Sequence, residues 1–407
     1  MKKTVLRKYA KLIVNKGVSI KKGDRVVINA ELDQPEFVKM VVEECYKSGA
    51  AKVEVDWSYA PLSKIHIKNR SLKVLSTLEN WEIEKWNHRK ETLPAMIYLI
   101  SEDPDGQKGV DMKKAAKAMQ AKSKIIKPIR NEMENKYKWC IAAVPGADWA
   151  KKMFPELSKR AAVEKLWEVI LFTSRVDDDP EAAWDAHNED LKNRCDYLNS
   201  LGLVSLEYKS SNGTDLRVGL IENALFLGGG EYTLGGEFFN PNIPTEEVFI
   251  SPKAGEAEGI VYSSKPLSYQ GMMIENFYVK FEGGKVVEVG AEKGEELLKE
   301  IVAMDAGAAQ LGECALVPQK SPVAESGLIF YNTLFDENAA CHLALGMGFS
   351  NCIKNYENYT LKECQDMGIN DSIIHEDFMI GTDDLSIIGV TKDGARVEIF
   401  KDGNWAF

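Results

Sequence analysis

Short apolar runs alternate with helix-period patterns through the first half of the 407-residue chain. Residues 25–30 (RVVINA) follow a Lys-Lys-Gly-Asp turn and predict a buried strand, and residues 36–48 place their apolar side chains on one helical stripe. Further strands are predicted at 52–57, 96–101 and 139–144. Strands that alternate with helices predict a parallel sheet covered on both faces, so an α/β fold is expected for this half.

The pattern changes near residue 200. Residues 161–201 are helical throughout, whereas a strand–turn–strand pattern follows Gly202 and glycine pairs then punctuate a β-rich region. Helices are predicted there near 293–304 and near 337–347. We therefore predict two domains: an α/β domain with a parallel sheet at residues 1–200, and an antiparallel-rich α+β domain at residues 201–407.

Composition narrows the class of protein. A net charge of −11 argues against a general affinity for nucleic acid or an anionic membrane surface, and the basic stretch at 113–130 is predicted to be a solvated helix face. The N-terminus lacks the apolar core of a signal peptide, and no run approaches the ~18–20 apolar residues of a membrane span. Seven scattered cysteines without a CxxC pair indicate reduced thiols. We expect a cytoplasmic protein.

Histidines are few, and two of the five stand out. The HExxH, Walker and GxSxG motifs are absent, so they offer no guide. His66, His88 and His187 lie in polar surroundings and are predicted to be surface residues. His342 and His375 lie in apolar segments, each with a carboxylate close in sequence. A lone histidine of this kind is usually a core residue, but two with acidic neighbours favour a site.

Strand alternation sharpens the prediction around the second histidine. Residues 372–381 predict a strand, on which His375 and Asp377 would point to one face and Glu376 to the other. Glu313 is the single carboxylate of the apolar run 311–317. A buried charge is costly unless it is paired or bound to a metal.

Backbone geometry also restricts which other acids can contribute to a site. Glu246 and Glu247 lead directly into an apolar strand, so only one of them can face a site. Glu337 and His342 are five residues apart, about 140° around a helix. Both can be ligands only if Glu337 lies at or before the start of that helix.

Four segments together resemble the aminopeptidase T / aminopeptidase S family of metallopeptidases. They occur in the family's order, and the match extends over essentially the whole chain. The segments are NIPTEEVF at 242–249, LGECALVP at 311–318, ENAACH at 337–342 and NDSIIHEDFMIG at 370–381.

The resemblance implies an aminopeptidase that removes N-terminal residues from peptides, and a homodimer. It also implies a pair of divalent metal ions held by Glu247, Glu313 (bridging both), Glu337, His342, His375 and Asp377, so that the second, α+β domain carries the metal site. Oxygen and imidazole donors without thiolate suit Zn, Co or Mn. Two such ions ~3.5–4 Å apart can activate a water and stabilise the oxyanion of a tetrahedral intermediate.

One position departs from the family pattern. The family usually has a tyrosine seven residues after the motif histidine, where this chain has Phe349. Either Phe349 packs in a variant whose metals act alone, or the protein is a catalytically weak metal- or peptide-binding homologue. Glu246 is the nearest unassigned acid and the candidate general base. A third alternative, an α/β binding protein without metal, would make the six acids and histidines a coincidence; metal analysis and a peptidase assay separate the three.

Overall fold

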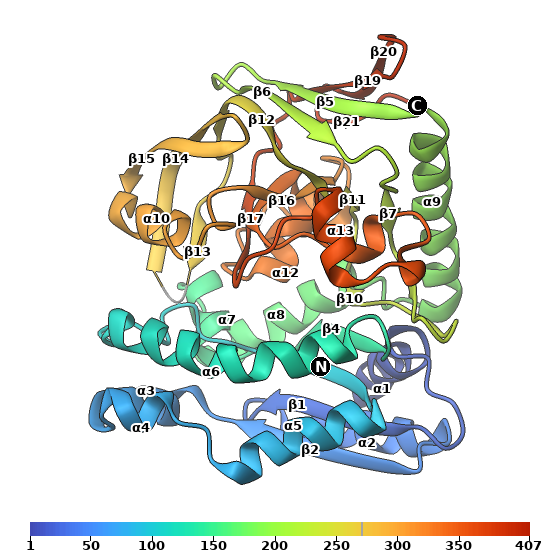
Figure 1. Ribbon diagram of the computed structural model, residues 1–407. Coiled ribbons are helices and arrows are strands. Elements are labelled where there is room, and N and C mark those ends of the chain that lie inside the picture. The colour runs from blue at the N-terminus through green and yellow to red at the C-terminus, as the bar shows by residue number, and fades with distance from the viewer. Residues whose placement is uncertain (270–271) are drawn as a thin grey trace. The chain divides into compact units, whose positions relative to one another are not determined.

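The computed structural model describes residues 1–269 and 272–407 (Figure 1). These residues form two compact units: unit 1 contains residues 1–186 and 230–244, and unit 2 contains residues 187–229 and 245–407. Helix α9 (Pro180–Ser200) continues across the first of these limits. The domain boundary near residue 200 stays a prediction.

Unit 1 is built on a parallel sheet with the strand order β10-β4-β3-β1-β2. The run Val26–Ile28 in its middle is buried throughout, which is typical of a parallel strand covered on both faces. The predicted strands are β1 (Arg25–Glu31), β2 (Lys52–Ser58), β3 (Ala95–Ile100) and β4 (Trp139–Ala143); β10 (Asn242–Ile243) adds to the edge, and β8 (Glu231–Tyr232) pairs with β9 (Phe238–Phe239).

Helices lie around this sheet (Figure 1). The predicted helix at 36–48 is α2, and the basic stretch forms α6, which has an exposed lysine-rich surface. The helices of this unit are α1 (Lys3–Leu12), continued by the π-helical turn Ile13–Gly17, α2 (Pro35–Lys47), α3 (Ala60–Asn69), α4 (Leu72–Ser76), α5 (Asn80–Thr92), α6 (Met112–Met133), α7 (Ala147–Met153) and α8 (Lys159–Thr173). In the described residues, no helix is both long and apolar enough to cross a membrane.

Unit 2 contains two antiparallel sheets, as the strand–turn–strand pattern and the glycine pairs of its sequence predicted. The smaller sheet has the order β18-β17-β16-β11-β7, and the larger has the order β13-β14-β12-β6-β5-β19-β20-β21 with β15 beside β14. The smaller sheet consists of β7 (Leu227–Gly228), β11 (Val248–Ile250), β16 (Leu311–Leu316), β17 (His342–Gly346) and β18 (His375–Met379).

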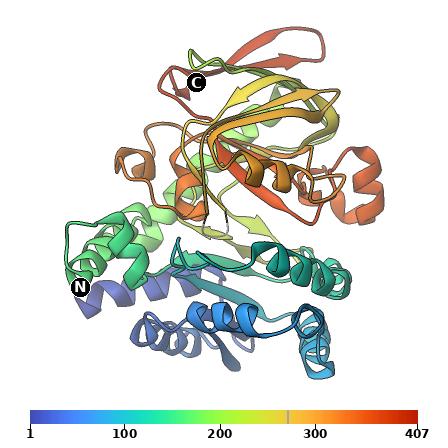
Figure 2. The same cartoon turned by 90° about the vertical axis from the view of Figure 1, so that its left-hand side faces the viewer.

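The larger sheet holds the long strands, and its hairpin β14–β15 is the yellow-to-orange pair in Figure 2. Its strands are β5 (Leu203–Lys209), β6 (Asp215–Leu220), β12 (Pro252–Tyr262), β13 (Leu267–Tyr269), β14 (Met272–Glu282), β15 (Lys285–Lys293), β19 (Ser386–Thr391), β20 (Arg396–Lys401) and β21 (Asn404–Trp405). The helices of unit 2 besides the end of α9 are α10 (Glu295–Val302), α11 (Pro322–Glu325), α12 (Thr333–Asp336) and α13 (Leu361–Met367), with 3-10 turns at Glu337–Ala339, Ser350–Cys352 and Tyr356–Asn358.

One face of the smaller sheet packs into the core that it shares with the larger sheet. We call it the core face. Its side chains are Val248, Ile250, Cys314, Leu316, Leu343, Leu345 and Phe378, and they join one buried cluster with Leu206, Val218, Phe277 and Ile387 of the larger sheet. Because strand side chains alternate, every second residue of these strands projects from the other face.

The predicted helix near 337–347 is wrong. Residues 337–339 form a single 3-10 turn, and the apolar run His342–Gly346 is strand β17, paired with β16 on one side and β18 on the other. After His342 the run has no polar side chain, so its periodicity did not separate helix from strand, and pairing with two neighbouring strands decides the outcome. The helix predicted near 293–304 is α10.

Candidate metal centre

The face opposite the core face brings the predicted ligands together. In the sheet register Glu313 lies opposite Ala344, and Ala344 lies opposite Asp377. Directly paired residues of antiparallel strands share a face, and residues two apart on one strand also share it. His342 of β17 and His375 of β18 therefore project from the same face as Glu313 and Asp377. We call this the ligand face.

Glu376 lies on the core face, as the alternation predicted. It pairs with Leu345, a core residue. Burial, with a smaller contribution from the charge of Asp377, raises the pKa of Glu376 to about 8. This carboxyl is therefore separated from the other acids by the sheet itself. Cys314 also faces the core, and all seven cysteines are buried thiols.

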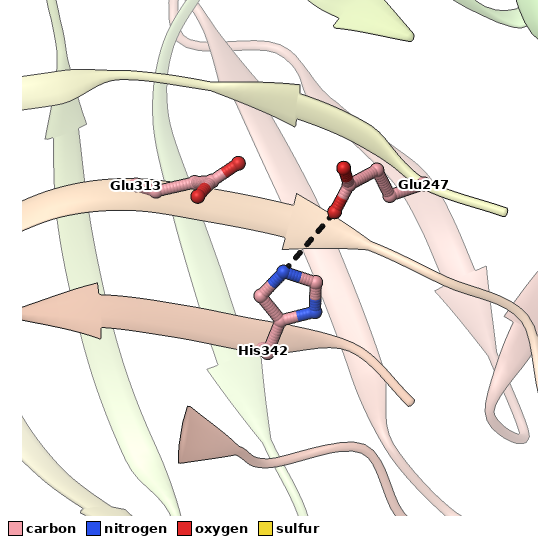
Figure 3. A group of neighbouring side chains, drawn as sticks. All are labelled: Glu247, Glu313 and His342. Carbon is pink, nitrogen blue, oxygen red and sulfur yellow. Dashed lines mark ion pairs between the residues drawn. The ribbon is translucent and has the colours of Figure 1, made fainter. Parts of the chain in front are cut away.

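Five ligand-face side chains form two groups of donor atoms. Glu247, Glu313 and His342 place one donor each within 4.8 Å of one another, and so do Glu313, His375 and Asp377. Glu313 is common to both groups. Figure 3 shows the first group, with the carboxylate of Glu247 beside the ring of His342 and the Glu313 carboxylate on the neighbouring strand.

Each imidazole is oriented by a backbone carbonyl. His342 Nδ1 lies 3.1 Å from the Ala340 carbonyl oxygen, and His375 Nδ1 lies 2.7 Å from that of Met347. These contacts place a proton on Nδ1, so each Nε2 can offer a lone pair, as in metal-binding histidines generally. His342 Nε2 lies 3.2 Å from Glu247 Oε2, and His375 Nε2 lies 3.0 Å from Glu313 Oε2.

A glycine allows one of these orienting carbonyls to come close. The β16–β17 register shifts between Leu311 and Glu313, and a Cβ on Gly312 would lie 2.2 Å from the Met347 carbonyl oxygen. A side chain at this position would push away the carbonyl that fixes His375. Gly312 therefore leaves room for the carbonyl that orients His375 on β18.

The electrostatics of the group show a shortage of positive charge. Burial alone would lower the pKa of His342, but the hydrogen bond and charge of Glu247 outweigh it and raise that pKa to about 10. Burial raises the pKa of Glu313, against the opposing effect of His375. Burial would also raise the pKa of Asp377, yet the charge of His375 lowers it. Burial favours the protonated forms of the glutamates, and the surrounding carboxylates favour the protonated form of His342.

Divalent metal ions fit these residues. Asp377 Oδ1 is buried and receives no hydrogen bond from the described part of the chain, although His375 Nε2 lies 3.4 Å away. Each Nε2 lone pair also faces carboxylate oxygens, so a proton or a cation must lie between them. The donor chemistry, carboxylate with neutral imidazole and no thiolate, is that of Zn, Co or Mn sites.

Glu337 lies at the edge of this group. It is the first residue of the 3-10 turn after α12 and lies before β17, so it and His342 no longer need to share a helix. Burial raises the pKa of Glu337 well above its usual range, and the charges of Asp377 and Glu247 raise it further. Its carboxyl is therefore within electrostatic reach of the donors, although it belongs to neither group of three.

Glu246 belongs to neither donor group. Its backbone N–H donates to Asn338 Oδ1 at 2.6 Å, and its carboxylate lies 3.8 Å from His187 Nε2. Of the two consecutive acids, Glu247 is thus the one that belongs to a donor group.

The predicted surface position of His187 is wrong, whereas His66 and His88 are exposed as predicted. The His187 side chain is 9% exposed, and its Nε2 lies 2.7 Å from the Thr245 carbonyl oxygen. The polar local sequence gave no sign of this, because the partner is 58 residues away along the chain.

Asn338 was not among the predicted site residues. It is fully buried, and its side chain links the segments that carry two acids: Oδ1 accepts from Glu246 N–H, and Nδ2 donates to the Leu334 carbonyl at 2.7 Å and lies 3.4 Å from Glu337 Oε1. A buried amide must be hydrogen-bonded on both sides. An asparagine directly after an acidic motif residue was the available sequence signal.

Phe349 lies beside His375. Its ring centre is 4.8 Å from that of His375 and 5.7 Å from that of Phe249. Its backbone N–H donates to Ser251 Oγ at 2.8 Å, which fixes the loop between β17 and the following 3-10 turn.

A sheet face that brings together three acids and two histidines, with its other face in the core, defines a protein with a candidate carboxylate–histidine metal centre. The chain belongs to the thermophilic metalloprotease (M29) family, whose sequence model matches residues 2–405. The predicted family is thereby confirmed, and so is the prediction of an enzyme that hydrolyses peptide bonds.

Characterised relatives span the whole chain. Aminopeptidase AmpS of Bacillus subtilis (strain 168) is 40% identical over 404 residues, which cover 99% of this chain and 98% of the relative. Aminopeptidase 2 of Geobacillus stearothermophilus is 41% identical over the same shares. The structure of wild-type AmpT from Thermus thermophilus matches with a TM-score of 0.91 and 35% identity, covering 100% of both chains. This match confirms the predicted fold class.

Proposed function

We propose that this metalloprotease is a metal-dependent aminopeptidase with two ions per chain, held by Glu247, Glu313, Glu337, His342, His375 and Asp377. The observation that carries the proposal is the position of Glu313, which belongs to both donor groups. A carboxylate has two oxygens and can serve two ions at once, so two groups of three donors that share Glu313 suit a dinuclear centre.

The metal ions, when bound, would supply Lewis acidity and lower the pKa of a bound water toward neutrality. The chain's own groups prepare this chemistry. The carbonyl oxygens of Ala340 and Met347 hold the protons of the two histidines on Nδ1, and so keep each Nε2 as a neutral donor. The core face on the other side of the sheet excludes water from behind the centre.

Aminopeptidase specificity is proposed from the relatives, which are named aminopeptidases and align over nearly their full length. Peptides with a free N-terminus would be the substrates. Glu246 remains the candidate general base. Its carboxylate lies 3.8 Å from His187, which could exchange a proton with it. The homodimer remains a proposal that rests on the family resemblance, and the cytoplasmic location remains a proposal that rests on the seven free cysteine thiols.

The alternative is a catalytically weak homologue that binds metal or peptide. One observation favours it: a phenylalanine, which has no hydrogen-bond donor on its ring, stands beside His375 where the family usually has a tyrosine. An oxyanion would then lack one donor.

Hydrolysis of a panel of aminoacyl p-nitroanilides, after chelation and after addition of Co, Zn or Mn, tests the proposal. We expect no turnover after chelation and recovery with at least one ion. An N-terminally acetylated substrate is the matched control and should not be cleaved. Two bound ions per chain without any turnover would support the weak homologue, and the absence of bound metal would overturn both alternatives.

A further inference from the structure

An apolar row continues the ligand face toward the edge of the smaller sheet. In the register Leu227 of β7 pairs with Phe249 of β11, Phe249 with Ala315 of β16, and Ala315 with His342 of β17. Directly paired residues share a face, so three apolar side chains lead in a straight line across the strands to a proposed metal ligand.

The same residues follow the acidic ligands along their strands. Phe249 is two positions after Glu247, and Ala315 is two positions after Glu313. Strand alternation thus places each apolar side chain directly beside a carboxylate on one face. The row and the donor groups form a single surface, half acidic and half apolar.

These side chains are not part of the core shared by the two sheets. They form a separate cluster in which Phe249, Ala315 and Cys352 pack with the half-buried Leu227 and Phe349. We call this cluster the apolar subsite. Phe249 and Phe349 meet edge to face at 5.7 Å, and Phe349 reaches the ring of His375 at 4.8 Å. The subsite therefore touches both donor groups, through His342 and through His375.

We propose that the apolar subsite binds the side chain of the substrate's N-terminal residue, and that the preferred substrates begin with an apolar residue. The inference rests on the proposed aminopeptidase function. An exopeptidase must hold the terminal amine at its metal centre, so the first side chain lies within a few bond lengths of the ligands. Beside the ligands lies the apolar subsite, whose accessible members are the half-buried Leu227 and Phe349, packed over the buried Phe249 and Ala315.

Charge explains why the preference should be strong. The members of the subsite carry no charged group, and the carboxylates beside them would be occupied by the proposed metal ions. A lysine or glutamate side chain buried there would therefore lose its hydration without gaining a partner. An apolar side chain gains from the same burial. Differences of one methylene in such pockets change kcat/KM by about 10–200-fold, so discrimination against a charged terminus should be at least of that order.

The test compares kcat/KM for Leu-, Phe-, Lys- and Glu-p-nitroanilide, in wild type and in Leu227→Asp, with the bound metal measured in each. Wild type should favour Leu and Phe over Lys by about 10-fold or more. Leu227→Asp should lower the Leu:Lys ratio by at least about 10-fold while keeping its metal. Leu227→Ala, which adds no charge, should weaken Leu and Phe alone and serves if the aspartate variant does not fold.

Val287→Asp is the matched control, because it adds the same charge at a position of strand β15 in unit 2 that is 52% exposed and outside the subsite. Its Leu:Lys ratio should equal that of wild type. A wild-type preference for Lys or Glu, or equal ratios in Leu227→Asp, Leu227→Ala and wild type, would overturn the subsite while leaving the aminopeptidase intact. Failure of the metal-loaded wild type to cleave any substrate in the panel would overturn the proposed function and the subsite with it.

Discussion

Phe349→Tyr tests whether this enzyme lacks one hydroxyl that its family usually has. The ring lies 4.8 Å from the ring of His375, so a hydroxyl on it would be close to the proposed centre. If that hydroxyl donated to the developing oxyanion, kcat should rise on the order of 10²–10³-fold, about 2.7–4 kcal/mol of transition-state stabilisation. KM should change little, because the interaction forms only in the transition state.

The packing of the ring sets the competing outcome. Phe349 is half-buried and meets Phe249 edge to face, while its backbone is fixed by Ser251. A hydroxyl directed into that packing would be buried without a partner and would cost about 1–3 kcal/mol of folding free energy. For a unit of about 200 residues each kcal/mol lowers Tm by about 2–4 °C.

The assay measures kcat, KM and Tm of Phe349→Tyr with the metal loaded. Phe172→Tyr is the matched control, since it adds the same hydroxyl to a ring of α8 that is 60% exposed and outside the proposed site, and it should leave kcat unchanged. A higher kcat in Phe349→Tyr alone supports the missing-donor hypothesis. An unchanged kcat, or a lower Tm without any gain in rate, would refute it and assign Phe349 to packing.

Four further predictions concern the proposed bridging ligand, a buried amide, a partly buried acid and the oligomeric state. Glu313→Gln should lose both ions together; two ions per chain by elemental analysis would contradict the bridging role. Asn338→Ala should lower the free energy of unfolding by about 1–3 kcal/mol in urea, because the Glu246 N–H loses its partner. Asn338→Asp should not restore stability, because a buried carboxylate cannot donate to the Leu334 carbonyl and would lie beside Glu337. Burial, with Glu102 and Asp33 nearby, raises the pKa of Glu31 to about 7, so its ionisation weakens the fold as pH rises from about 4.5 to 7. Glu31→Gln should therefore raise Tm at pH 8 and leave it nearly unchanged at pH 4, and equal shifts at both values would exclude this cause. Light scattering at micromolar concentration should give a dimer mass, and a monomer mass would end the dimer proposal.

The pattern of apolar and polar residues predicted the structure correctly where the side-chain period of one element was enough to decide it. Alternation along residues 372–381 placed His375 and Asp377 on one face and Glu376 on the other, and the sheet has this arrangement. The alternation of strands and helices likewise predicted the parallel sheet of unit 1. In both cases the side-chain period of the element is fixed by backbone geometry, which does not depend on distant partners.

Local pattern failed where distant partners decide. The apolar run after Glu337 suits a helix or a buried strand, and its pairing with β16 and β18 makes it strand β17. That change removes the conflict over Glu337 and His342, because a turn now separates them.

Segments far apart in sequence also assemble the support of the site. Asn338 joins the loop before β11 to the turn before β17, and His187 bonds to a carbonyl 58 residues away. The sequence by itself determined the types of donor. Carboxylate and imidazole groups in apolar runs are costly to bury unless they are paired or bind a metal. Which donors share Glu313, and which side chains hold them there, was decided only by the packing of strands from distant parts of the chain.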